Sequence, residues 1–202
     1  ENQVGLSLDQ ILLATDFSPA SDLAAGYAKS LAKRFSSWLT LAHVIAPSVA
    51  SPSEPAFAEI PIEKGRKDST EKQERLLTEM KAAVVSAATR TLESQNPAVS
   101  IVRLGEQLAS DLIITGTHAR QGLSRAILGS CAEGIIRHAS CPVLTIGPKV
   151  KPAPQGPLSF HTVVFATDFS SNTAMEAAVA LSFAKDSLSK VLLCHVIDHS
   201  GK

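Results

Sequence analysis

The chain has 202 residues, of which 45% are hydrophobic and 19% charged, a composition typical of a protein that folds around a buried core. Its 19 basic and 19 acidic side chains balance, so the overall charge does not favour binding to nucleic acid or to an anionic membrane surface. With neither a signal-peptide pattern nor an apolar run of about 18 residues, the length that spans a bilayer, we expect a cytoplasmic protein.

Apolar segments alternate with helix-like segments along the chain as far as residue 147. The first helix has clear start signals, because Ser18 is a suitable N-cap and Pro19 fits the first helical turn. The alternation predicts a parallel sheet covered by helices on both faces. In chain order, strands are expected at residues 10–16, 38–45, 99–104, 111–116 and 142–147, and helices at 19–34, 69–94 and 130–139.

The connection between the third and fourth expected strands is too short. Only "GEQLAS", residues 105–110, separates the segment "VSIVRL" from "DLIITG". A crossover between parallel strands needs about a dozen residues or more, usually with a helix. We therefore expect a crossover helix to be missing from the chain near 105–110; the alternative is that one of the two strands is wrongly assigned.

An internal repeat organises the whole chain. "LSLDQILLATDFS" at 6–18 returns as "LSFHTVVFATDFS" at 158–170, and "LAHVI" returns as "LCHVI". Both pairs have the same offset of 152 residues (168 − 16 for the aspartates and 195 − 43 for the histidines). The repeat predicts a first domain at 1–148, a proline-containing linker at 149–157, and a partial second domain at 158–202 with a strand, a helix and a strand.

The cysteine and histidine patterns do not favour a metal site or a disulfide framework. Cys131, Cys141 and Cys194 are odd in number and form no C-x-x-C pair. His118 and His138 lie 20 residues apart without a carboxylate at ligand spacing. We therefore expect reduced thiols and no bound metal ligated by these residues.

The residues themselves suggest a ligand site at the carboxyl ends of the strands, where open α/β sheets bind ligands. Asp16 follows the first strand and could accept hydrogen bonds from a ribose or an adenine; the alternative role is a turn residue that caps the next helix. The segment "GTHARQGLSRAILGS" follows the fourth strand, and Gly129-Ser130 introduces a helix whose unpaired N–H groups suit a phosphate. It is not a P-loop, since no lysine stands at the required place.

Taken together, "ILLATDFS", "LAHVI", "SDLIITGTHARQGLSRAILGS" and "SCAEGIIRHASCPVLTIGP" resemble, in that order, segments of the universal stress protein family. The resemblance implies a Rossmann-like α/β fold with a five-stranded parallel sheet in the order 3-2-1-4-5. It also implies pairing through the last strand, residues 142–146 from Pro142 to Ile146, as a homodimer or as two domains of one chain.

The same resemblance implies a nucleotide site, because ATP-binding members carry G-2x-G-9x-G-[ST] after the fourth strand. The match begins at Gly116 and ends at Gly129-Ser130, with Ala119 where the family places its second glycine. Asp16 and Val44 match the adenosine-contacting positions, and Asp168 and Val196 match them in the second repeat. The candidate nucleotide-binding residues are Thr15, Asp16, Val44, Gly116, His118, Ala119, Arg120, Gly129, Ser130 and Cys131.

The leading hypothesis is a stress-response protein that binds ATP, with or without Mg²⁺, or a related adenine nucleotide. It would act as a nucleotide-dependent switch or dimerisation module, with at most weak ATPase activity and no assigned catalytic residue. The alternative is a member that binds no nucleotide and serves as a dimerisation or partner-interaction module, which Ala119 favours. An adenylating enzyme is disfavoured, since neither S-G-G-x-D-S nor H-x-G-H occurs.

Overall fold

The computed structural model describes residues 8–47, 59–83, 85–117, 129–184 and 189–197. The chain forms two compact units, which are Leu8–Gln155 and the residues from Gly156 onward. The larger unit contains β1 (Gln10–Ala14), α1 (Pro19–Phe35), β2 (Trp38–Ile45), α2 (Glu59–Ala82), β3 (Ala87–Glu93), α3 (Pro97–Gln107), β4 (Leu112–Gly116), α4 (Ser130–His138) and β5 (Val143–Ile146).

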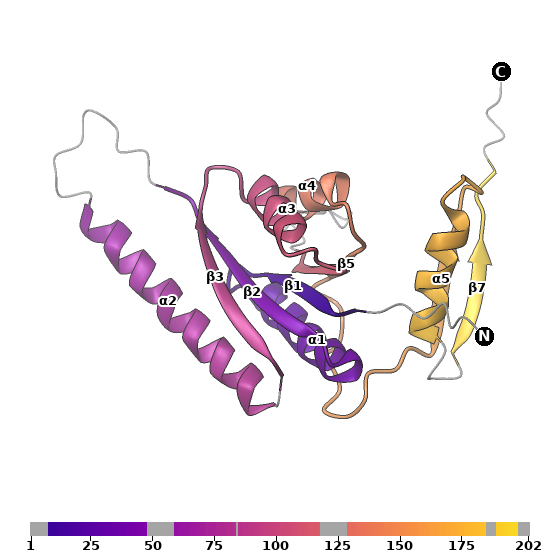
Figure 1. Cartoon of the computed structure of the whole chain (residues 1–202), viewed down its shortest axis with the longest axis horizontal. Coiled ribbons are helices and arrows are strands. Elements are labelled where there is room, and N and C mark those ends of the chain that lie inside the picture. Colours follow the sequence, from indigo (N-terminus) through magenta and orange to yellow (C-terminus); the bar gives the residue numbers. More distant parts are fainter. Residues whose placement is uncertain (1–7, 48–58, 84, 118–128, 185–188, 198–202) are drawn as a thin grey trace, which may run out of the picture. The chain divides into compact units, whose positions relative to one another are not determined.

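The five strands of this unit form one parallel sheet in the order β3-β2-β1-β4-β5, the order that the family resemblance implies. The helices α1 and α2 lie on one face of the sheet, and α3 and α4 lie on the other (Figure 1). The core on the α3 and α4 side is a cluster of buried residues: Leu12, Ala14, Ala42, Ile101, Leu104, Ile113 and Ile135. Both faces of the sheet are therefore covered, which suits its continuously apolar central strands.

The first helix begins where the sequence predicts. The backbone N–H of Ser21 donates a hydrogen bond to the side chain of Ser18 at 3.3 Å, and Pro19 occupies the first turn. The helix ends at Phe35, and its C-cap, Ser36, has a φ of 56° in the left-handed region. Its buried face consists mainly of alanine, which lets the helix approach the sheet closely.

The segment predicted as the third strand is a helix, and the prediction is wrong there. Residues 99–104 lie inside α3, where the side chain of Asn96 accepts a hydrogen bond from the backbone N–H of Val99 at 3.3 Å. Strand β3 instead occupies Ala87–Glu93, within the range predicted as a long helix. The helix thought to be missing near 105–110 is therefore α3 itself, and it supplies the crossover from β3 to β4.

The smaller unit contains β6 (Thr162–Ala166), α5 (Thr173–Ala184) and β7 (Lys190–Cys194), and its two strands pair in parallel. Its first turn repeats the hydrogen bonds of the larger unit. The N–H of Phe169 donates to Thr167 Oγ1 at 3.0 Å, as Phe17 does to Thr15 at 3.1 Å. Phe169 and Phe17 also share positive φ values, 58° and 59°. The repeat in the sequence is thus a repeat in local structure.

Candidate functional site: a pocket at the carboxyl ends of β1, β2 and β4

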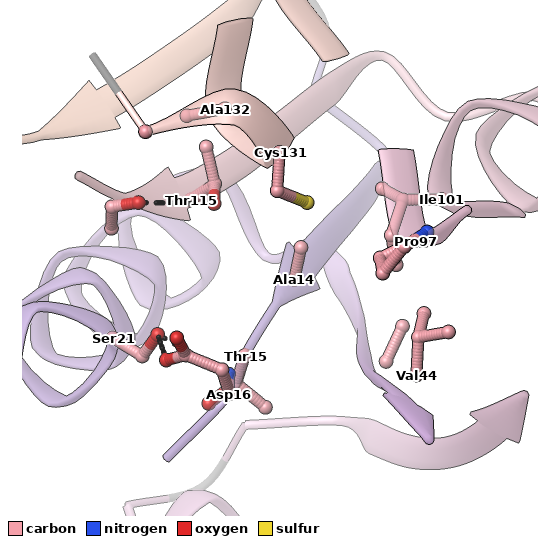
Figure 2. Close-up of a pocket in the computed structure, with 13 residues that line it drawn as sticks. Ala14, Thr15, Asp16, Ser21, Val44, Pro97, Ile101, Thr115, Cys131 and Ala132 are labelled. Atoms are coloured by element: carbon pink, nitrogen blue, oxygen red, sulfur yellow. Dashed lines mark hydrogen bonds between the residues drawn. The ribbon is translucent and has the colours of Figure 1, made fainter. Parts of the chain in front are cut away.

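A pocket of about 220 Å³ opens where β1, β2 and β4 end. This is the edge of the sheet at which parallel α/β proteins bind ligands, between the strands where the order reverses. Two groups of side chains line it on separate sides (Figure 2). The apolar group is Val44, Pro97 and Ile101, and the polar group is Asp16, Ser21 and Thr115.

The carboxylate of Asp16 is held by the turn that joins β1 to α1. Its Oδ1 accepts a hydrogen bond from the hydroxyl of Ser21 at 2.5 Å and another from the backbone N–H of Ser18 at 3.0 Å. These two bonds fix the direction of an exposed negative charge at the edge of the pocket. Asp16 therefore stabilises the turn and lines the pocket, whereas the N-cap of α1 is Ser18 and not Asp16.

A histidine on the neighbouring strand stabilises the same turn. His43 Nδ1 lies 2.8 Å from the carbonyl oxygen of Thr15, so this nitrogen carries the hydrogen. The ring of Phe17 lies 4.6 Å from the His43 ring between centroids, and the ammonium of Lys72 lies 5.8 Å from the Phe17 ring centroid. The loop after β1 therefore contacts both β2, through His43, and α2, through Lys72.

Gly116, at the end of β4, lies against the backbone of α1. A Cβ added at Gly116 would be 2.5 Å from the carbonyl carbon of Ala20 and 2.7 Å from the backbone nitrogen of Ser21. Such distances exclude any side chain, because both neighbours are main-chain atoms. Glycine is therefore needed here for close packing between a strand and a helix.

Gly129 has the opposite surroundings. Among the residues that the structure describes, none apart from its chain neighbours has an atom within 4 Å of a Cβ added at Gly129. Gly129 is the N-cap of α4, with φ of −61° and ψ of 146°, and it forms no side-chain capping bond. The first N–H groups of a helix have no intrahelical acceptor, and the helix dipole favours an anion beside them. Gly129, Cys131 and Ala132 bring this helix start into the pocket lining.

Cys131 places a thiol in the pocket. Figure 2 shows its sulfur directed toward the space between the apolar and polar groups of lining residues. Burial raises the pKa of the Cys131 thiol, and the nearby negative charge of Asp16 raises this pKa further. Cys131 is therefore a thiol at neutral pH, and its ionisation depends on the charge of Asp16 across the pocket.

The structure brings six of the predicted site residues together in this lining: Thr15, Asp16, Val44, Gly116, Gly129 and Cys131. Ser130 begins α4 beside them but is exposed and does not line the pocket. His118, Ala119 and Arg120 lie outside the described residues, so the predictions for them remain predictions. Ser21, Pro97, Ile101, Thr115 and Ala132 also line the pocket and were not identified from the sequence.

Across residues 8–47, 59–83, 85–117, 129–184 and 189–197, no group of three or more His, Cys, Asp or Glu side chains is arranged to hold a metal ion. Within the same ranges, every helix is too short or too polar to cross a lipid bilayer.

Comparison with known proteins gives a consistent family. The model of the universal stress protein family matches residues 7–147. Universal stress protein MJ0531 of Methanocaldococcus jannaschii is 34% identical over 142 residues, which cover 68% of this chain and 81% of that protein. A solved universal stress protein family structure from Burkholderia pseudomallei has a TM-score of 0.59 at 27% identity, covering 74% of this chain and 99% of its own.

A third similarity concerns the fold alone. The universal stress protein from Archaeoglobus fulgidus, solved in complex with dAMP, has a TM-score of 0.51 at 15% identity. The match covers 68% of this chain and 96% of that one.

Proposed function

Because this chain belongs to the universal stress protein family, we propose that it binds an adenine nucleotide, ATP or a relative of ATP, in the pocket formed by β1, β2, β4 and α4. The observation that carries the proposal is the joint presence of Asp16, Val44 and Gly129 in one lining, although they come from three separate parts of the chain. A family neighbour from Archaeoglobus fulgidus solved with dAMP supports the choice of an adenine nucleotide.

The two sides of the pocket fit the two ends of a nucleotide. Val44, Pro97 and Ile101 offer an apolar surface on which a planar base can be buried. Asp16 is an acceptor for a ribose hydroxyl or a base amino group. The first N–H groups of α4 lack intrahelical acceptors, and no described residue fills the Cβ position of Gly129, which suits a phosphate.

We assign this site to binding and not to efficient turnover. The carboxylate of Asp16 already accepts hydrogen bonds from Ser18 and Ser21, so its observed role is to hold the turn. Bound nucleotide would join α1, α3 and α4 across one pocket, which suits a switch. Association through β5 would provide the response, since β5 is an edge strand of the sheet that the described residues form.

The sharpest test replaces Gly129, because no described residue occupies its Cβ position and its backbone conformation suits any residue. Gly129→Asp and Gly129→Asn both provide good N-caps of nearly equal size, but only Asp adds a negative charge. We expect isothermal titration to give an ATP or AMP affinity at least about tenfold weaker for the Asp variant than for the Asn variant. Adenosine, which has no phosphate, should bind the two variants alike.

Two results would count against the proposal. Equal ATP affinity of the Asp and Asn variants would show that the phosphate does not lie at the start of α4. No measurable binding of Mg-ATP to the unmodified chain at millimolar concentration would favour the alternative, a dimerisation or partner-interaction module that binds no nucleotide.

A further inference from the structure

The main chain just before Asp16 is held by the neighbouring strand. Strand β1 ends at Ala14, so Asp16 projects from the segment that follows the strand. The N–H of Thr15 donates to the carbonyl oxygen of Ala42 at 2.9 Å, and the carbonyl oxygen of Thr15 accepts from His43 Nδ1 at 2.8 Å. Both main-chain polar groups of Thr15 are thus bound to β2, and a side chain makes the second of these bonds.

His43 reaches this carbonyl from outside the pocket. Its neighbours in β2, Ala42 and Val44, both line the pocket, whereas His43 does not. Alternate residues of a strand point to opposite faces, so the imidazole lies on the face away from the lining. The imidazole contacts the ring of Phe17, which also faces the ammonium of Lys72 on α2. His43 therefore affects a ligand through the residues that it holds and not by contact.

The conformation of Phe17 depends on such support. Its φ of 59° lies in the left-handed region, which is costly for a residue with a bulky side chain. Phe17 stands between the donor and the acceptor of the hydrogen bond from the N–H of Ser18 to Asp16 Oδ1, at 3.0 Å. The change of chain direction at Phe17 brings these two groups together, and the ring contact with His43 stabilises it.

The second repeat builds the same arrangement on a sheet of two strands. His195 Nδ1 lies 2.7 Å from the carbonyl oxygen of Thr167, and the rings of His195 and Phe169 are 4.7 Å apart between centroids. The N–H of Ser170 donates to Asp168 Oδ1 at 2.8 Å. The left-handed phenylalanine and the bonded aspartate therefore occur together with the histidine contact in both units.

We propose that His43 is a positioning residue of the pocket. By donating a hydrogen bond to the Thr15 carbonyl and supporting the ring of Phe17, it holds the Asp16 carboxylate where a bound nucleotide meets it. The inference rests on the proposed function, in which Asp16 accepts a hydrogen bond from a ribose hydroxyl or a base amino group. An acceptor that is fixed before the ligand arrives loses little freedom on binding, so affinity depends on how well it is held.

The thiol of Cys131 reports the position of Asp16 without any ligand. Burial raises the pKa of Cys131, and the charge of Asp16 adds to this effect. His43→Phe keeps a ring but removes the donor, so the carboxylate should leave its place. The pH profile of Cys131 alkylation by iodoacetamide should then shift to lower pH, toward that of Asp16→Asn. His43→Asn, whose side-chain N–H lies close to the place of Nδ1, should restore the unmodified profile.

Two controls separate positioning from general loosening of the fold. His195→Phe makes the same change in the smaller unit, to which no lining residue of the pocket belongs, and should leave the Cys131 profile unchanged. In a chain that already carries Asp16→Asn, His43→Phe should cause no further shift. If His43→Phe loses its helical circular dichroism, His43→Gln, whose amide reaches the place of Nε2 and not of Nδ1, replaces it.

Two results overturn the proposal. One is a Cys131 profile that His43→Phe leaves unchanged. The other is an equal shift with and without the Asp16 charge, because His43 would then act on the burial of Cys131 and not through Asp16.

Titration with Mg-ATP connects the position of Asp16 to binding. His43→Phe should bind ATP about three- to tenfold more weakly than the unmodified chain, as expected for one lost hydrogen bond, and His43→Asn should restore the affinity. Equal affinity of the Phe variant would overturn the link between His43 and the ligand. An unmodified chain that binds no ATP contradicts the proposed function instead, whereas the thiol profiles, measured without ligand, still decide whether His43 holds Asp16.

Discussion

Gly116 and Ala20 approach so closely that a methyl group on the glycine would lie 2.5 Å from the carbonyl carbon of the alanine. The contact joins the end of β4 to the first turn of α1, and both partners are main chain. One wall of the pocket is therefore formed where the backbones of β4 and α1 are in direct contact. Ser21, which follows Ala20, also binds the carboxylate of Asp16.

Replacing this glycine should be costly. We expect Gly116→Ala to lower the free energy of unfolding by about 2 kcal/mol or more, because overpacking against rigid neighbours is not relieved by side-chain rotation. Gly156→Ala is the control, since a Cβ at Gly156 would lie more than 4 Å from every described atom beyond its chain neighbours. Urea denaturation followed by circular dichroism measures both changes. Similar stability of the two variants would mean that α1 shifts away from β4 without penalty.

A second prediction concerns the thiol in the pocket. If a nucleotide fills the space beside Cys131, saturating ATP should slow alkylation of Cys131 by iodoacetamide. Cys194 is exposed on the other unit, so it serves as an internal reference whose alkylation rate should not change with ATP. Peptide mass spectrometry at several time points separates the two rates. Equal rates at Cys131 with and without ATP would place the nucleotide elsewhere.

The same thiol gives a pH prediction. Because burial and then the charge of Asp16 raise the pKa of Cys131, its thiolate forms only at alkaline pH, and alkylation should accelerate as the pH rises through that raised pKa. Asp16→Asn removes the charge while its amide oxygen can still accept from Ser18 and Ser21. This variant should shift the rate profile of Cys131 to lower pH, whereas an unchanged profile would show that burial alone sets the pKa.

Asp168, in the first turn of the smaller unit, gives a second pH prediction. Hydrogen bonds from the backbone N–H and the side chain of Ser170 lower the pKa of Asp168, with the N–H to Oδ1 distance being 2.8 Å. A lowered folded-state pKa means that the turn is stabilised above the usual carboxyl pKa and loses this support as pH falls through the folded value. We expect Ser170→Ala to raise the pKa measured by NMR and Ser171→Ala to leave it unchanged. A titration midpoint of Asp168 at the usual carboxyl value would contradict the hydrogen-bonded turn.

The helix α3 shows where prediction from sequence failed. Its Asn96-Pro97 start has the same form as Ser18-Pro19, with a capping side chain followed by proline at the first helical position. The β-branched residues that follow favoured a strand. Burial of Ile101, Val102, Leu104 and Gly105 follows one helical face, and tertiary packing on the sheet decides the outcome.

The predicted and the missed site residues differ for a physical reason. Asp16, Val44 and Gly116 lie at the ends of three strands whose apolar runs were recognised, so parallel pairing alone brings them to one edge of the sheet. Pro97 and Ile101 enter the pocket only because α3 crosses back over that edge. Once their segment was assigned to a strand, no local pattern could place them beside Val44.

The turn after β1 has a consequence for protein engineering. Thr-Asp-Phe-Ser adopts one shape in two places, once beside a complete five-stranded sheet and once beside a pair of strands. In each case a histidine contacts the threonine carbonyl: His43 within β2 at 2.8 Å, and His195 directly after β7 at 2.7 Å. These four residues and the histidine thus form a turn motif that can be grafted. Grafted onto another parallel sheet, they should present a carboxylate in a fixed direction.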